Sequence, residues 1–295
     1  MLISVVNHTG GKLSDEEVQD GIRAVNRQIA HDFLPHWHMG AELRLEGAIG
    51  KDPDEESLPE LRGDAILYLW DEVNVDDALG YHDRHARGVP FGFVFTELVK
   101  EVGEPWTVTF SHEALELLAD PEANLLVAGR HPADPDREVF HWYEMCDAVQ
   151  DETYKVDGVP VSNFLLPLYF TPDVEEGGRN DFLGRLYKGK PLGSFGINPG
   201  GYIGFYNPQS GQHETYALKG DKRARARMAI KGKAQMTRRS MRYRAGTSYP
   251  EQIRKLARRA QPRRARPAVA RAAANASRAV EMIAQAPKRL GLGVD

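Results

Sequence analysis

Apolar residues in the first part of the chain fall into short runs that predict strands. Some runs are continuously apolar, which is typical of buried strands, and others alternate with polar residues, which is typical of strands with one face in water. The expected strands are residues 2–6, 42–46, 65–70 and 90–99. Because helical patterns lie between them, we expect an α+β fold.

The first predicted helix begins at a capping box and ends before a proline. Ser14 is the expected N-cap, and Glu17 stands at the third helical position, where its carboxylate can accept a hydrogen bond from the Ser14 N–H. The apolar residues that follow recur at helical spacing, at positions 18, 22, 25 and 29. We expect this helix to end near Pro35, because proline cannot continue a helix.

A second predicted helix, over residues 110–120, carries the most informative chemistry of the chain. His112 and Glu116 are four residues apart and therefore share one face of the helix, with Glu113 beside them. This is the zinc-hydrolase pattern H-E-x-x-H with glutamate in place of the second histidine. We expect an amphipathic helix whose polar face supplies two metal ligands, His112 and Glu116, and a general base, Glu113. The alternative is an ordinary helix with a charged outer face.

A catalytic zinc site needs a third protein ligand, which we expect from downstream of the helix because the predicted sheet lies on the other side. Glu144 is the first candidate, with Asp147 as the outer partner that fixes the tautomer of His112. The reverse assignment, with Asp147 as the ligand, stays open. Two carboxylates and one imidazole would shift the preference from Zn²⁺ toward harder ions such as Mn²⁺, Fe²⁺ or Ca²⁺.

His82 lies just before the last predicted strand and has two interpretations. It is a candidate to reach the substrate or the metal, even as the missing nitrogen ligand. Alternatively, it is a polar loop residue that makes hydrogen bonds within a turn.

The order of strand, long helix, three strands and metal helix resembles the amino-terminal half of the zincin metallopeptidase fold. The segments 79–95, 111–113, 144–147 and 161–167 also resemble uncharacterised bacterial and phage-associated proteins. The resemblance extends from residue 1 to about 170. It implies a metallopeptidase-like fold, with a mixed, twisted sheet over the active-site helix. The motif itself gives the expected function, which is zinc-dependent hydrolysis of a peptide or protein substrate.

Three regions are expected along the chain. Residues 1–172 form the zincin-like domain, and residues 173–218 form a small β extension with a hairpin of strands 203–206 and 214–218. Residues 219–295 form an Arg/Ala-rich basic tail that is largely unstructured or helical.

Charge is divided unevenly between these regions. Of the 38 Lys and Arg residues, 22 lie in residues 219–295, together with only 4 of the 42 Asp and Glu residues. The tail therefore carries a net charge of +18 and the rest of the chain −22. We expect the tail to bind nucleic acid or an acidic protein partner, or to be a solvated arm. The candidate contact residues are Arg223, Arg225, Arg227, Arg238, Arg239, Arg258, Arg259, Arg263 and Arg264.

The remaining patterns concern location and an alternative function. The amino terminus shows no secretory signal and no apolar run reaches membrane-spanning length, so a cytoplasmic protein without membrane contact is expected, or one packaged in or exported by a phage-like particle. The single Cys146 excludes an intrachain disulfide. The function that competes with a metal-dependent hydrolase is a non-enzymatic structural or cargo protein of such a particle.

Overall fold

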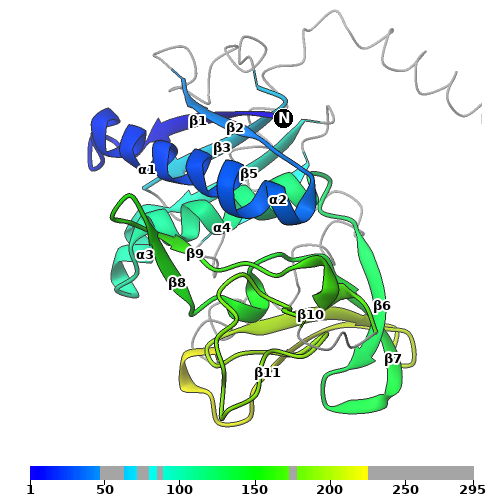
Figure 1. Cartoon of the computed structure of the whole chain (residues 1–295). Coiled ribbons are helices and arrows are strands. Elements are labelled where there is room, and N and C mark those ends of the chain that lie inside the picture. Colours follow the sequence, from blue (N-terminus) through cyan, green and yellow to red (C-terminus); the bar gives the residue numbers. More distant parts are fainter. Residues whose placement is uncertain (47–62, 72–79, 85–88, 173–177, 225–295) are drawn as a thin grey trace, which may run out of the picture.

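The structure, a computed structural model, describes residues 1–46, 63–71, 80–84, 89–172 and 178–224. Within these residues the protein is a mixed α+β structure with parallel and antiparallel sheets (Figure 1). The elements in chain order are β1 (Leu2–His8), α1 (Asp15–Gln28), the π-helical turn η1 (Ile29–Phe33), α2 (Leu34–Trp37), β2 (Glu42–Leu45), β3 (Ala65–Trp70), β4 (Gly80–Arg84), β5 (Pro90–Phe95), α3 (Thr96–Glu101), α4 (Trp106–Ala119), β6 (Leu126–His131), β7 (Asp134–Trp142), the 3-10 turn η3 (Asp147–Val149), β8 (Thr153–Val156), β9 (Val159–Ser162), the 3-10 turn η4 (Pro167–Phe170), β10 (Tyr202–Asn207) and β11 (Gln212–Ala217).

A five-stranded sheet with the order β2-β1-β3-β5-β4 forms the first layer. Its first four strands are parallel, and β4 runs antiparallel to β5 at the edge. Residues 65, 67 and 69 of β3 pack into the main core with α1 and α4, whereas residues 66, 68 and 70 join an aromatic cluster with Phe93. Because successive side chains of a strand point to opposite faces, both faces of the sheet are buried.

The first helix confirms the predicted capping box and extends past the predicted end. Ser14 accepts a hydrogen bond from the Glu17 N–H, and the Glu17 side chain accepts one from the Ser14 N–H. The helix continues through η1 and α2 to Trp37, and Pro35 lies at the start of α2, directly after the π-helical turn. His38 then ends it in the left-handed conformation, at φ 55°.

The helix α4 is buried along almost its whole length, which rules out the alternative of a charged outer face. Every residue from Thr107 to Ala119 is buried, and the helix packs against β4, β5 and β9. Two hydrogen bonds fix it to β9: the Thr107 hydroxyl donates to the Pro160 carbonyl at 2.7 Å, and Ser111 Oγ accepts from the Ser162 N–H at 2.7 Å. The polar side chains of α4 therefore point into the protein.

A second, antiparallel sheet with the order β11-β10-β7-β6 lies beyond α4, and β8 and β9 form a separate hairpin (Figure 1). The predicted hairpin of the β extension is present as β10 and β11. Strand β10 also pairs with β7, with Phe205 opposite His141. Residues from both sides of position 172 therefore contribute to one sheet.

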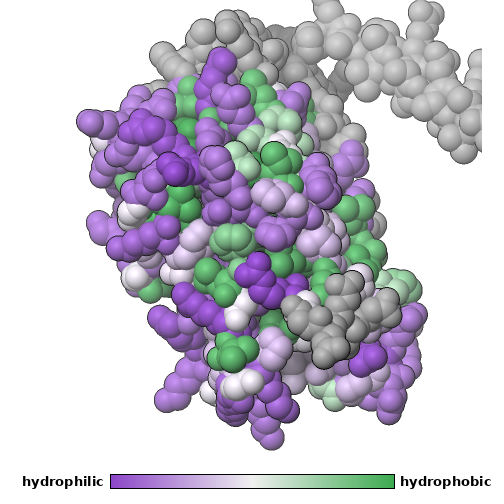
Figure 2. All heavy atoms as spheres, in the orientation of Figure 1, coloured by the Kyte–Doolittle hydropathy of each residue, from purple (hydrophilic) through white to green (hydrophobic). Residues whose placement is uncertain are grey.

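The face of the molecule that carries α1 and α2 is mainly hydrophilic, and its hydrophobic residues lie in small separate groups (Figure 2). Leu186 is the most exposed large hydrophobic residue in the described part of the chain, at 65%. None of the helices among the described residues has both the length and the apolar composition needed to cross a membrane.

Candidate metal centre

The three polar residues of the H-E-x-x-E helix are buried. The exposed fractions are 5% for His112, 4% for Glu113 and 4% for Glu116. An ordinary charged outer face is therefore excluded. A buried carboxylate costs several kcal/mol unless a partner or a metal compensates its charge, so the neighbours of these residues define what the site can hold.

Two carboxylates, those of Glu116 and Asp147, contact the same ring nitrogen of His112. His112 Nε2 lies 3.2 Å from Glu116 Oε1 and 3.4 Å from Asp147 Oδ1. Both carboxylates thus approach the same ring nitrogen, whereas an outer partner that fixes the tautomer of a ligand histidine contacts the other nitrogen. The geometry favours the reverse assignment of the sequence analysis, with Asp147 rather than Glu144 beside His112 as a ligand.

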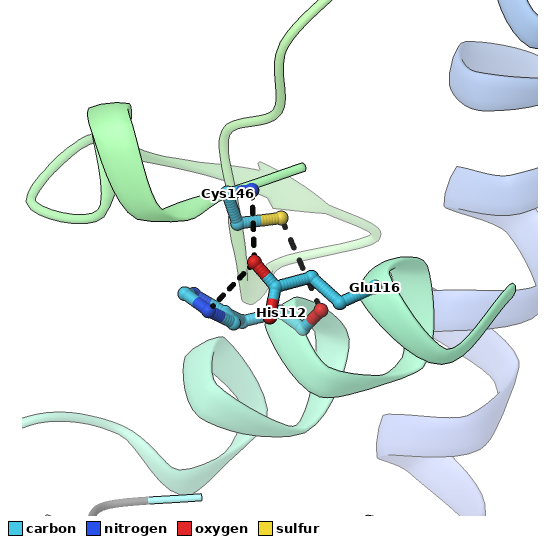
Figure 3. Close-up of side chains that lie close together, drawn as sticks. All are labelled: His112, Glu116 and Cys146. Carbon is cyan, nitrogen blue, oxygen red and sulfur yellow. Dashed lines mark hydrogen bonds and ion pairs between the residues drawn. The ribbon is translucent and has the colours of Figure 1, made fainter. Parts of the chain in front are cut away.

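The backbone of Cys146, in the segment after β7, holds the Glu116 carboxylate in place (Figure 3). The backbone N–H of Cys146 donates to Glu116 Oε1 at 3.2 Å, and its thiol contacts the His112 carbonyl oxygen at 3.9 Å. Burial, reinforced by the charge of Glu116, raises the pKa of the Cys146 thiol well above its usual value. The ligand atoms of His112, Glu116 and Cys146 all lie within 4.8 Å of one another, so the thiolate of Cys146 is a further candidate ligand.

A second histidine faces Glu116 from the opposite side. His82 is on the edge strand β4, where it pairs with Gly92 of β5, and its Nδ1 lies 3.7 Å from Glu113 Oε2 and 3.7 Å from Glu116 Oε2. His82, Glu116 and Glu144 offer ligand atoms that all lie within 4.8 Å of one another. The structure therefore places both His82 and Glu144 in the site, with His82 on the Oε2 side of Glu116.

The carboxylates of the site raise the pKa of both histidines. Burial alone lowers the pKa of His112, but the negative charge of Glu116 and the contact with Asp147 outweigh it and raise that pKa well above its usual value. His82 follows the same pattern: burial opposes its charge, and Glu113, Glu144 and Glu116 raise its pKa. Burial likewise opposes the charge of Glu116, but His112 lowers its pKa overall. A field that holds a proton on each imidazole attracts a metal cation, which binds with release of those protons.

The distances and the donor set fit a divalent ion. Two ligand atoms about 2.1 Å from a tetrahedral Zn²⁺ are separated by about 3.4 Å. The contacts of His112 Nε2, at 3.2 and 3.4 Å, match this separation. In addition, two buried atoms, His82 Nε2 and Glu113 Oε2, have no hydrogen-bond partner among the described residues. Imidazole and carboxylate together suit Zn²⁺, Mn²⁺ and Fe²⁺.

Two further residues shape the site without a sequence signal that marks them. The Tyr202 hydroxyl donates to Asp147 Oδ1 at 2.5 Å across 55 residues of sequence, a contact that no local pattern indicates. A Cβ on Gly80 would lie 2.6 Å from Glu113 Oε1, so the glycine allows β4 to approach the helix closely. An isolated glycine at the start of a strand is the one hint that the sequence offers.

Of the predicted contact residues in the basic tail, only Arg223 lies within the described residues. Its guanidinium donates to Asp151 Oδ2 at 2.6 Å, and its side chain is exposed. The remaining arginines predicted to bind nucleic acid or an acidic partner lie outside the described residues. The role of the tail stays a prediction.

Comparisons with protein families, with curated proteins and with solved structures return no match for this chain. A function is therefore inferred from the residues, distances and charges of the site.

Proposed function

We propose that the chain binds a divalent metal ion through His112, Glu116 and Asp147 and acts as a metal-dependent hydrolase, of the metallopeptidase kind, on a peptide or protein. The observation that carries the proposal is the convergence of two buried carboxylates on His112 Nε2 at the separations of metal ligands. Zinc is the first candidate, and Mn²⁺, Fe²⁺ and Ca²⁺ are the alternatives for a carboxylate-rich ligand set.

Glu113 is the proposed general base. A divalent ion in such a site supplies Lewis acidity, which polarises a carbonyl group and makes water a stronger acid. Glu113 Oε2 is buried and has no hydrogen-bond partner in the described part of the chain, so it can accept a proton. His82 Nδ1, 3.7 Å away, stabilises the charge of this carboxylate.

The position of the site under a sheet edge supports a peptide substrate. In zincins, which the sequence resembles, the metal helix lies under a mixed sheet whose edge strand borders the cleft and pairs with an extended substrate. Here α4 packs against β5 and against β4, the antiparallel edge strand of a mixed sheet. The backbone of β4 is therefore the proposed pairing partner of the peptide.

The proposal is tested by metal content and hydrolysis on matched variants. Plasma mass spectrometry on protein purified without added metal is expected to find at least one divalent ion per chain, lost in His112→Ala. His31, an exposed histidine of η1, supplies the control variant His31→Ala, which should keep the metal. Glu113→Gln should keep the metal and lose hydrolysis in a screen of peptide substrates.

Two results would contradict this function. If the wild-type protein stays free of metal even after zinc or manganese is added, the proposed metal site is contradicted. Hydrolysis that survives in both His112→Ala and Glu113→Gln would show that other residues carry the activity.

A further inference from the structure

We propose that the centre is dinuclear: a second divalent ion binds to His82, Glu144 and Oε2 of Glu116, so that Glu116 bridges two ions. This inference rests on the proposed function, because the first ion shares Glu116.

The two oxygens of Glu116 face different histidines. Oε1 lies 3.2 Å from His112 Nε2, and Oε2 lies 3.7 Å from His82 Nδ1. A carboxylate that presents one oxygen to each of two imidazoles has the arrangement of a bridging ligand. In two-metal hydrolytic sites the ions are about 3.5–4 Å apart, a span that one carboxylate bridges.

Each side of Glu116 has the same types of ligand. His112 and Asp147 lie on the Oε1 side, and His82 and Glu144 share a group of ligand atoms with Glu116. Glu144 follows β7 and Asp147, three residues later, is the first residue of η3, so one segment of chain supplies one carboxylate to each position.

The contacts of His82 leave room for an ion. Its Nδ1 lies 3.7 Å from both Glu113 Oε2 and Glu116 Oε2, which is too long for a hydrogen bond. The His82 side chain is only 4% exposed, and its Nε2 has no hydrogen-bond partner among the described residues. A buried imidazole usually has a close partner, and an ion between Nδ1 and the carboxylates would supply one on that side of the ring.

The charge of the cluster also favours two ions. The groups that face the site include four carboxylates, Glu113, Glu116, Glu144 and Asp147, and two imidazoles. Imidazole binds metal in its neutral form, so the formal charge of these six groups is −4 when the carboxylates are ionised. Two divalent ions balance this charge, whereas one leaves −2 in a largely buried site.

The experiment is a titration of the full-length apo-protein with Mn²⁺ alone, followed by stoichiometry and electron paramagnetic resonance. Wild type is expected to bind two Mn²⁺ ions per chain and to show the broadened spectrum of an exchange-coupled pair. His82→Asn and the nearly isosteric Glu144→Gln should each bind one ion and show the resolved hyperfine pattern of isolated Mn²⁺. His31→Ala, folded and outside the site, should behave as wild type.

The outcomes separate this inference from the proposed function. One uncoupled ion in wild type, unchanged in His82→Asn and Glu144→Gln but lost in His112→Ala, overturns the second site and leaves the first intact. Two ions in wild type that remain in both His82→Asn and Glu144→Gln also overturn it. No bound ion in wild type contradicts both proposals. Circular dichroism on each variant shows whether a lost ion reflects a lost fold.

Discussion

Tyr202 tests whether Asp147 is a metal ligand, because its hydroxyl donates a hydrogen bond to Asp147. The hydroxyl donates to Oδ1 at 2.5 Å, and Tyr202 is 2% exposed. Tyr202→Phe removes this one donor and keeps the ring in place. A hydrogen bond to a charged group contributes about 1.5–3 kcal/mol. Partners that orient metal ligands change metal affinity about 10- to 100-fold, which corresponds to about 1.4–2.8 kcal/mol of binding free energy.

Competition with a chromophoric chelator of known affinity measures this loss on the apo-protein. Tyr154→Phe is the matched control, because the Tyr154 hydroxyl donates at 2.8 Å to Asp32, a carboxylate outside the site. Both variants should lose stability in urea, and only Tyr202→Phe should lose Zn²⁺ affinity. Equal affinities in the two variants would refute the assignment of Asp147 as a ligand held by Tyr202.

Three further perturbations give separate tests. Burial lowers the pKa of His141 from its ordinary value of 6.5 to about 4, so the unfolded chain takes up the proton first and stability falls as the pH drops through this window. Between pH 7 and 5 the protonation of His141 in the unfolded chain should lower the free energy of unfolding by about 2 kcal/mol. His141→Gln should remove that part of the pH dependence of the urea midpoint. An unchanged pH dependence would contradict the lowered pKa of His141. Gly80→Ala would place a Cβ 2.8 Å from the Phe93 carbonyl oxygen and 2.6 Å from Glu113 Oε1. This crowding should lower the free energy of unfolding by about 1–3 kcal/mol and reduce hydrolysis. Unchanged thermal unfolding and activity would argue against close packing at this position. Free Zn²⁺ at about a hundred times its Kd should stabilise the apo-protein by about 2.7 kcal/mol, which raises the Tm by roughly 5–10 °C. A chelator should reverse this rise. A Tm that changes with neither Zn²⁺ nor the chelator would count against the site.

Local signals in the sequence predict a large part of the first layer. The capping box at Ser14 and Glu17 and the apolar runs of β1, β2 and β3 are confirmed, because each depends on neighbouring residues. The strand expected over residues 90–99 was too long. Strand β5 ends at Phe95 and α3 follows, since the apolar residues in this run suit either element.

In the candidate site, too, features that depend on neighbouring residues could be predicted, and those that depend on contacts between distant segments could not. His112, Glu113 and Glu116 follow from helical spacing, but the burial of their face does not. Spacing fixes which side chains share a face and leaves open what that face contacts. The proximity of His82 to Glu116 depends on the pairing of β4 with β5 and on the packing of α4 against both strands. Such contacts between distant segments have no signature in a single sequence.

The most direct test of the metal centre is an anomalous difference map, recorded at the zinc absorption edge from crystals of the zinc-loaded protein. The proposed function predicts a peak about 2.0–2.2 Å from His112 Nε2 and from carboxylate oxygens of Glu116 and Asp147. A second peak beside His82 and Glu144 would support the dinuclear centre. A map with no peak at His112, or with zinc bound only by residues elsewhere, would contradict the central claim.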